Sequence, residues 1–348
     1  MAEESDEEPG LIALARQGIH LVGWRGALQT ATYGLRKSRL DRRYRRGQPS
    51  GPEVRPGHRG EVRTEHGVTT IAFGDLTLEV AFVDDGLVRL TWTPGSLPVP
   101  AALGPTHVDR APMDDVLARD VDGGLVFTTY VLRVTVGADG AIEVAHRDGA
   151  NKDVPLRDDW RVVRRERPPV RIGERWTAIV ELEPDDQVHG LGERAAPLNL
   201  RPGTYGLWNT EQSGSYGPEA DPLYITIPVH LVVGPGRSHL GFWENTHQGT
   251  VTVADTLTAA FEGGALRTYV APGRPSQALG QFHHLTGEPE LPPRWALGYH
   301  QCRWGYKTEA DIREVMAGFK AHDLPVSAIH FDIDYMDRYR VFTVNQEA

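Results

Sequence analysis

The residues with the clearest potential for chemistry lie close to the C-terminal end of the sequence, in the segment His330-Phe-Asp332-Ile-Asp334. In a β-strand, residues two apart share a face, so His330, Asp332 and Asp334 would point to one side of an extended chain. Carboxylates at the C-terminal end of a parallel strand lie where (β/α)8-barrel enzymes place their active sites. The pattern therefore predicts an active-site or binding edge at the end of this strand.

Two other interpretations of this segment stay open at this point. In the first, Asp334 caps a following loop and His330 is an interior, hydrogen-bonded residue, because the D-x-D pattern is common. In the second, His330 and Asp332 bind a metal together with His300 and Cys302. Mixed soft and hard ligands without a compact spacing disfavour that site, so no metal is predicted.

Aromatic residues mark a second candidate, in the segment Trp295 to Tyr306. Trp304 and Tyr306 fall where the preceding strand should end, and aromatic faces there could stack on the apolar faces of sugar rings. The alternative is that these side chains plug a core between two domains, which applies above all to Trp295.

A third candidate is the segment Gly206 to Tyr216, rich in glycine, serine and aromatic residues, with one acid, Glu211. This composition is typical of a long functional loop, although an ordinary hairpin loop would share it. The nearby turn His189-Gly-Leu-Gly-Glu193 lacks the GxGxxG pattern and a following helix, so we do not interpret it as a phosphate-binding loop.

Short alternating apolar runs separated by turn residues begin near Val62. Leu76 to Val83, Asp84-Asp-Gly86 and Leu87 to Thr93 form a strand, turn and strand that predict a hairpin. A similar pattern follows from Leu125 to Ala145. Many short strands with turns about every ten residues indicate a β-sandwich or barrel. Further strand candidates are Trp176 to Leu182, Leu223 to Val233, Leu240 to Glu244, Gly249 to Val253, Leu257 to Phe261 and Leu266 to Val270.

The pattern of short alternating strands ends near residue 275. A short helix is expected from Ser276 to Leu285, then a proline-rich linker, a strand from Trp295 to His300, a helix capped by Thr308, and a strand from Val326 to Ile333. This order is a β-α-β unit. A (β/α)8 barrel needs roughly 250 residues, so we expect the N-terminal part of a longer protein. The expected domains are residues 1–58 as a weakly ordered or partly helical lead-in, 59–285 as a β-sandwich, and 286–348 as the start of a barrel.

Composition excludes several classes of protein. The formal net charge of −10 argues against nucleic acid as a main partner, no apolar run reaches 18 residues, and the single cysteine, Cys302, excludes a disulfide framework. The basic run from Arg36 to Arg46 is interpreted as a solvated lead-in rather than an anion-binding patch. The acidic N-terminus is unlike a signal peptide, so a cytoplasmic protein without a membrane partner is expected.

Four segments together resemble glycoside hydrolase family 31, the α-glucosidase and α-xylosidase family. They read HGLGER (189–194), LWNTE followed by DPLYITIPV (207–229), LPPRWALGYHQCRWGY (291–306) and HFDIDYMDRYRVFT (330–343). The resemblance implies a mostly β protein, in which a galactose-mutarotase-like β-sandwich precedes the first βαβ unit of an incomplete (β/α)8 TIM barrel.

The family resemblance also implies a reaction, the retaining hydrolysis of an α-linked sugar at a non-reducing end. Two carboxylates perform such a reaction, and in the family both are aspartates on later barrel strands. The nucleophile and the acid/base are therefore expected beyond Ala348, no catalytic residue is assigned here, and this chain alone is expected to be inactive.

The resemblance carries over three substrate-binding residues. Asp332 matches the aspartate that hydrogen-bonds sugar hydroxyls in the −1 subsite, and Ile333 matches its apolar neighbour. Glu211 takes the place of an aspartate that the sandwich loop usually offers to the sugar. The expected partner is an oligosaccharide or α-glycoside, and no cofactor is implied. The alternative function is a stand-alone carbohydrate-binding or interaction module without catalysis. The sequence predicts neither the sugar and linkage nor the oligomeric state.

Overall fold

The computed structural model describes residues 50–96, 112–147, 159–211 and 217–346, together with a few single positions between 28 and 43. The predicted lead-in and the basic run 36–46 lie largely outside these residues. The chain divides into two compact units between Gly287 and Glu288. None of the helices in the described part of the chain is long and apolar enough to span a bilayer.

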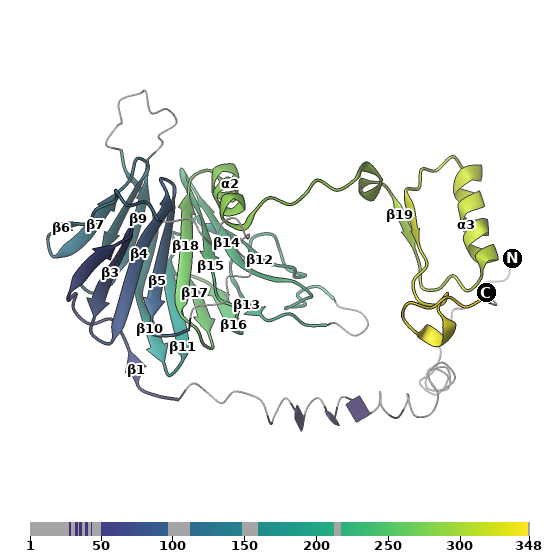
Figure 1. Ribbon diagram of the computed structural model, residues 1–348, viewed down its shortest axis with the longest axis horizontal. Helices are drawn as coiled ribbons and strands as arrows, with labels where there is room; N and C mark the ends of the chain where they lie inside the picture. Colours follow the sequence, from purple (N-terminus) through teal and green to yellow (C-terminus); the bar gives the residue numbers. More distant parts are fainter. Residues whose placement is uncertain are drawn as a thin grey trace. The chain divides into compact units, whose positions relative to one another are not determined.

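The first unit is built from two antiparallel sheets, whose strands are shown in Figure 1. Among the described residues, the larger sheet has ten strands and the smaller has eight. The ten-stranded sheet runs in the order β13 (Gly203–Leu207), β16 (Gly249–Val253), β17 (Thr256–Phe261), β11 (Arg175–Glu181), β10 (Arg161–Ile172), β9 (Ile142–His146), β8 (Leu132–Val136), β7 (Gly124–Thr128) and β6 (Arg119–Val121), with β1 (Glu53–Val54) paired to β10. The eight-stranded sheet runs in the order β12 (Gln187–Gly192), β14 (Thr226–Gly234), β15 (Arg237–Trp243), β18 (Leu266–Pro272), β5 (Leu87–Thr93), β4 (Leu76–Asp84), β3 (Val68–Phe73) and β2 (Val62–Glu65).

Buried and more exposed side chains alternate along the strands, which explains why the two sheets pack face to face. In β3, β8 and β11 every second side chain is buried, as expected when one face of a strand covers a core. Large side chains from both sheets, such as Phe82, Phe127 and Trp176, meet in one cluster. Removing each from water contributes roughly 1.5–3 kcal/mol to folding. The predicted β-sandwich is confirmed.

The first predicted hairpin is also confirmed. Strands β4 and β5 pair antiparallel, and the backbone N–H of Gly86 donates to Asp84 Oδ1 at 2.7 Å, which closes the turn. The run from Leu125 to Val136 is not one strand but two, β7 and β8. The hydroxyl of Thr129 accepts from the backbone N–H of Leu132 at 2.9 Å inside the turn that separates them.

Strand β10, the longest in the sandwich, was not predicted. Its sequence RVVRRERPPVRI is charged and contains Pro168 and Pro169, which have no N–H to donate to a neighbouring strand. The register with β11 shifts between Arg167 and Val170, so the two prolines fall in an irregularity rather than in the hydrogen-bonded ladder.

Helix α2 (Pro275–Thr286) covers the outer face of the eight-stranded sheet, beside β15 and β18 (Figure 1). Pro275 occupies the first helical position, where its missing N–H costs nothing. Leu285 is buried, and the ring of Phe282 meets that of Phe242 edge to face at 5.5 Å. The helix predicted from Ser276 to Leu285 is therefore confirmed.

A buried arginine connects the two sheets. The Nη1 atom of Arg164, on β10, lies 3.0 Å from His230 Nε2 and 3.1 Å from His239 Nε2, on β14 and β15. Its Nε atom pairs with Glu166. Since arginine can only donate, both imidazoles accept as neutral rings. Burial, and then the positive charge of Arg164, lowers the pKa of each histidine well below the ordinary value.

The second unit contains a 3-10 helix η1 (Arg294–Leu297), strand β19 (His300–Cys302), helix α3 (Glu309–Ala321), strand β20 (Ala328–His330) and a 3-10 helix η2 (Asp337–Tyr339). Strands β19 and β20 are parallel, so the predicted β-α-β unit is confirmed. The predicted cap is present, because Asp311 N donates to Thr308 Oγ1 at 3.2 Å and Thr308 N to Asp311 Oδ2 at 2.9 Å. The strand predicted from Trp295 is wrong at its start. After Pro292 and Pro293 the chain turns into η1, and the strand begins only at His300.

Candidate functional site

The first candidate site is the C-terminal edge of β19 and β20, in the second unit. His300 pairs with Ala328 and Cys302 with His330, so both strands end at the same level. Asp332 follows two residues after the last residue of β20, and its side chain is exposed. Its φ of 61° lies in the left-handed region. The expectation of an extended chain through Asp334 is therefore wrong, because the backbone turns at Asp332.

This turn separates the two aspartates of the D-x-D pattern. Asp334 is half-buried and packs against Gly305, in the loop after β19, where an added Cβ would lie 1.8 Å from Asp334 Oδ2. A hydrogen bond with Asp334 raises the pKa of the Tyr339 hydroxyl. Asp334 therefore contacts both the loop after β19 and Tyr339, which is not the simple loop cap of the alternative interpretation. The interior His330 of that interpretation is wrong, because His330 is exposed. Within the described residues, Asp332 forms no such contact and remains open to a ligand.

The histidines of the two strands form a pair. His300 Nδ1 and His330 Nε2 are 2.9 Å apart, and the two rings are stacked with centroids separated by 5.2 Å. The ring of Trp295 stacks on that of His300 at 5.8 Å. Among the residues that the structure describes, no three His, Cys, Asp or Glu side chains are arranged to hold a metal ion.

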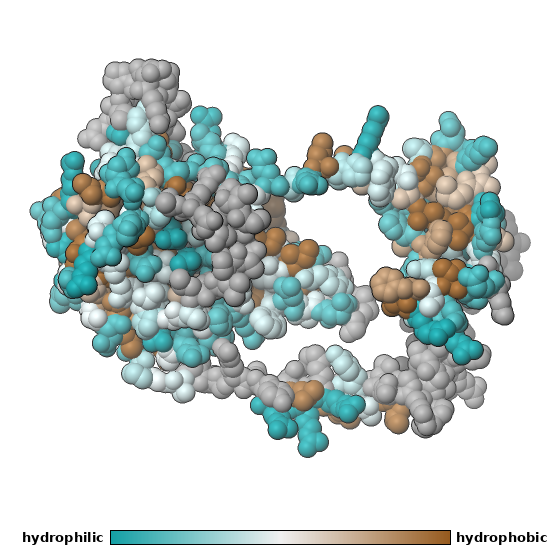
Figure 2. Space-filling view, in the orientation of Figure 1, coloured by the Kyte–Doolittle hydropathy of each residue, from teal (hydrophilic) through white to brown (hydrophobic). Residues whose placement is uncertain are grey.

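The aromatic residues after β19 divide into two kinds. Tyr306 is fully buried, and its hydroxyl accepts a hydrogen bond from Gln301 Nε2 at 3.1 Å, so it belongs to the packing of this unit. Trp304 is 77% exposed, and Ile333 is 38% exposed. Figure 2 shows apolar side chains gathered on the surface of this second unit. An exposed carboxylate beside apolar and aromatic surface is a suitable composition for binding a sugar.

A separate candidate site, in the first unit, is the loop between β13 and β14, which includes Glu211. Its base is fastened by two hydrogen bonds, from Thr210 N to Leu223 O at 2.9 Å and from Thr226 N to Asn209 Oδ1 at 3.0 Å. Glu211 is exposed. Residues 212–216 lie outside the described part of the chain. The loop therefore starts from a fixed stem, and Glu211 is next to that stem.

Residues of the HGLGER segment (189–194) contact the base of the same loop. Gly192 has a φ of 93°, and an added Cβ would lie 2.4 Å from Ile225 O, so only glycine fits. Arg194 forms a buried ion pair with Asp221, and burial lowers the pKa of this arginine. Asp221 Oδ2 also accepts from the backbone N–H of Gly206. The glycines of this segment thus let two strands approach, and its arginine fixes the base of the loop.

A cavity of about 730 Å³ adjoins the stem of this loop. Aromatic and polar residues line it, among them Trp208, Asn209, Phe242, Glu244 and His247. Arg267 Nη1 donates to Glu244 Oε2 at 3.2 Å, which balances the charge of this buried carboxylate. Burial, with the negative charge of Glu244, raises the pKa of neighbouring Tyr269 to about 12, so its phenol stays neutral. Sequence reasoning missed this cavity, since its lining comes from strands that are distant in the chain.

Two family profiles match the chain in the order of its two units. The profile of the glycosyl hydrolase 31 N-terminal galactose mutarotase-like domain matches residues 77–251, and that of the glycosyl hydrolases family 31 TIM-barrel domain matches residues 289–348.

The chain belongs to glycosyl hydrolase family 31. Among curated family 31 relatives, α-glucosidase 2 of Bacillus thermoamyloliquefaciens is 41% identical over 165 residues, which are 46% of this chain and 21% of that protein. Lysosomal α-glucosidase of Mus musculus is 32% identical over 186 residues, which are 52% of this chain and 19% of that protein. The chain thus spans about a fifth of the length of these relatives and resembles the N-terminal region of family 31 α-glucosidases.

Solved structures of carbohydrate-active enzymes share the fold. A Flavobacterium johnsoniae GH31 dextranase in complex with isomaltotriose superposes with a TM-score of 0.68 and 20% identity, over 81% of this chain and 34% of that protein. A Gracilariopsis lemaneiformis α-1,4-glucan lyase gives a TM-score of 0.70 and 14% identity, over 86% of this chain and 38% of that protein. The same architecture therefore occurs in proteins with different reactions.

Proposed function

We propose that this chain supplies the β-sandwich and the first barrel elements of a retaining α-glycosidase, with Asp332 as a sugar-binding residue. The observation that carries the proposal is the exposed carboxylate of Asp332 just beyond the C-terminal edge of two parallel strands. Barrel enzymes of this class bind their substrates at that edge.

Asp332 has the chemistry for this role. A carboxylate accepts hydrogen bonds from two sugar hydroxyls, and the negative charge strengthens both. Asp334 is occupied in holding the loop at Gly305, which leaves Asp332 as the available acceptor of the D-x-D pair. Ile333, which follows directly, offers an apolar surface to a sugar ring. We assign Glu211 the same kind of contact from the sandwich loop.

Besides residues that bind the sugar, retaining hydrolysis needs a pair of carboxylates about 5–5.5 Å apart that act as nucleophile and acid/base. We place this pair on barrel strands beyond Ala348, since the chain spans about a fifth of the α-glucosidases that it resembles. The 348-residue chain should then not release p-nitrophenol from p-nitrophenyl α-glucoside. Hydrolytic activity that co-purifies with the chain, and is absent from a mock purification, would contradict this placement.

The role of Asp332 is tested in the complete enzyme by Asp332→Asn, because asparagine keeps the shape and tolerates a left-handed backbone. Loss of the charged partner of a sugar hydroxyl should lower kcat/KM by roughly 30- to 150-fold, about 2–3 kcal/mol. The matched control is Asp323→Asn, also exposed, with a φ of 52°. If kcat/KM of Asp332→Asn equals that of the control, Asp332 does not bind the sugar.

The alternative function, a stand-alone carbohydrate-binding module, draws support from the cavity beside the β13–β14 loop. Its lining combines the half-exposed ring of Trp208 with the polar side chains of Asn209 and His247. Titration of the chain with isomaltotriose distinguishes the two functions. Saturable binding that Trp208→Ala abolishes, from a chain without hydrolytic activity, favours the module; no binding favours the proposed enzyme.

A further inference from the structure

A second cavity in the sandwich, of about 320 Å³, has a basic lining. It lies where the end of β9 and the start of β10 meet the β14–β15 turn and the residues that precede α2. Three arginines, Arg161, Arg237 and Arg274, line it together with His146, and none of the described lining residues is acidic. We propose that this cavity, which we call the arginine pocket, binds a compact oxyanion, the phosphate group of a small ligand.

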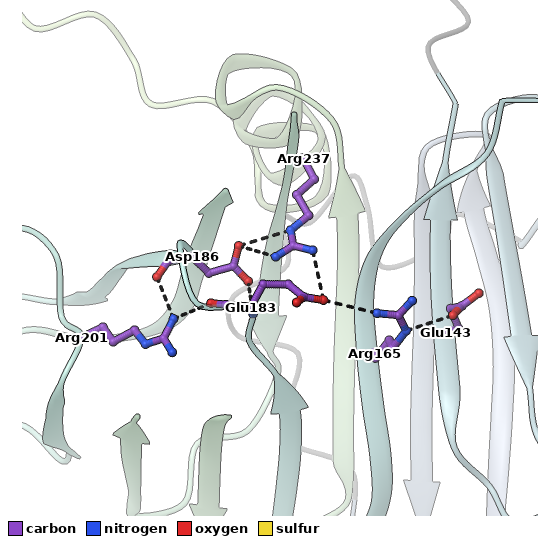
Figure 3. Close-up of polar contacts among 6 residues, drawn as sticks. All are labelled: Glu143, Arg165, Glu183, Asp186, Arg201 and Arg237. Atoms are coloured by element: carbon purple, nitrogen blue, oxygen red, sulfur yellow. Dashed lines mark hydrogen bonds and ion pairs between the residues drawn. The ribbon is translucent and has the colours of Figure 1, made fainter. Parts of the chain in front are cut away.

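Arg237 is held in place by two acidic side chains that are not among the lining residues, and Figure 3 shows these contacts. Its Nε and Nη2 atoms donate to Asp186 Oδ1 at 3.2 and 2.8 Å, and its Nη1 atom lies 3.4 Å from Glu183 Oε1. Glu183 and Asp186 belong to one turn of the backbone, and Arg201 fixes this turn. The Nη1 atom of Arg201 donates to the carbonyl oxygens of Glu183 at 2.6 Å and Asp186 at 3.1 Å. The guanidinium of Arg237 therefore does not need to be ordered by a ligand, which lowers the entropic cost of binding.

The other two arginines bring charge that the described residues do not balance. Within the described ranges, neither Arg161 nor Arg274 forms an ion pair with a carboxylate. Arg274 also precedes the 12-residue helix α2, whose N-terminus adds partial positive charge. Arg161 and Arg274 are exposed residues, and the charge of Arg237 is already balanced by Asp186 and Glu183. Arg161 and Arg274 are therefore the groups that offer unbalanced positive charge to an anion in this pocket.

The size and chemistry of the pocket select the ligand. Its volume is at the small end of ligand pockets, which excludes a large organic molecule. Guanidinium groups match the oxygens of phosphate in a bidentate geometry. The net charge of −10 on the whole chain opposes binding of an extended polyanion such as a nucleic acid. A single phosphate group would match the unbalanced charge of Arg161 and Arg274 without these costs. The pocket is independent of the glycosidase function proposed above.

The test is calorimetric titration of the full chain with inorganic phosphate at constant ionic strength. We expect saturable binding that Arg161→Gln combined with Arg274→Gln weakens by roughly tenfold or more. The matched control is Arg167→Gln, on the same strand β10, where the arginine pairs with Glu181 Oε1 at 3.0 Å and does not line the pocket. This control should bind phosphate as the unchanged chain does, and circular dichroism confirms that each variant is folded.

Titration with glucose 6-phosphate, compared with that of inorganic phosphate, identifies the source of the phosphate group. Tighter binding of glucose 6-phosphate than of inorganic phosphate indicates a phosphorylated metabolite, whereas equal or weaker binding indicates the free ion; either result supports the pocket. Absence of saturable phosphate binding would overturn the proposal. So would a loss of affinity in Arg167→Gln as large as in the double variant, because the effect would then be one of overall charge.

Discussion

The sandwich and the β19–α3–β20 unit differ in how they exclude water. In the sandwich, Trp176, Trp243 and Phe261 are completely buried between two sheets. In the second unit α3 has no buried residue, and Tyr306 is the one large side chain among residues 288–346 that water does not reach. The sandwich therefore has the core of an independent domain, whereas the second unit relies on local features such as its helix cap.

This difference also explains the position of the exposed apolar residues. A two-stranded sheet is marginally stable by itself, and here helix α3 contributes no buried side chain to it. Trp304 and Phe342, 77% and 101% exposed, belong to this unit. Such surface is expected at the start of a barrel, where later strands and helices supply the missing neighbours.

The largest expected effect tests the core. Trp176→Ala should lower the free energy of unfolding of the sandwich by about 3–5 kcal/mol, because it opens a cavity and removes the hydrogen bond from Trp176 Nε1 to Gly264 O. Phe319→Ala on α3 should change that free energy by less than about 1 kcal/mol. Urea unfolding followed by circular dichroism measures both. Equal losses would show that the two units unfold as one.

An intermediate effect is expected on the stability of the sandwich when the pH is lowered. His230 and His239 stay neutral in the folded sandwich, because their pKa values lie well below the ordinary value of 6.5. In the unfolded chain they take up protons as pH falls through 6.5, so stability is present above that pH and is lost below it. Between pH 7.5 and 5.5 protonation of the two histidines in the unfolded chain should lower the free energy of unfolding by roughly 2–3 kcal/mol.

Urea unfolding at the two pH values measures this loss. The second unit has no fully buried histidine among its described residues, so the protection of α3 amides from hydrogen exchange should change little over the same range. An unchanged free energy of unfolding of the sandwich at pH 5.5 would show that the pKa values of the buried histidines are not lowered by folding.

The smallest effect concerns the helix cap of the second unit. Thr308→Ala removes the side chain that accepts from Asp311 N, at a cost of about 1 kcal/mol to α3. Hydrogen exchange of α3 amides should become about fivefold faster, while unfolding of the sandwich is unaffected. Ser276→Ala is the control, because it lies in the first turn of α2 and is not the cap residue of that helix. Similar exchange rates in both variants would mean that neighbours, not the cap, stabilise α3.

Elements with strong local signals were predictable from the sequence. The Asp84-Asp-Gly86 turn between alternating runs and the Thr308 capping box depend on residues that are close in the chain. Strand β10 was missed because its charges and two prolines contradict strand propensity, and the irregular register that accommodates them depends on β11.

The candidate site was predictable only in part. The parallel pairing of β19 and β20 follows from the β-α-β pattern, but the left-handed backbone at Asp332 has no local signal. The roles of Asp334 against Gly305 and of Arg194 with Asp221 depend on contacts between residues 27 or more positions apart. No spacing rule connects such residues, so the structure was needed to separate the open carboxylate from the occupied one.

The contact of Arg164 with His230 and His239 has a mechanical consequence. It links a strand of one sheet to two strands of the other within the apolar layer between the sheets. Sliding one sheet past the other would break both contacts at once and leave the buried guanidinium with Glu166, on its own strand, as its remaining partner in a medium of low dielectric constant. The sandwich should therefore resist shear, and a ligand bound at one of its ends would not shift the loops at the other by that motion.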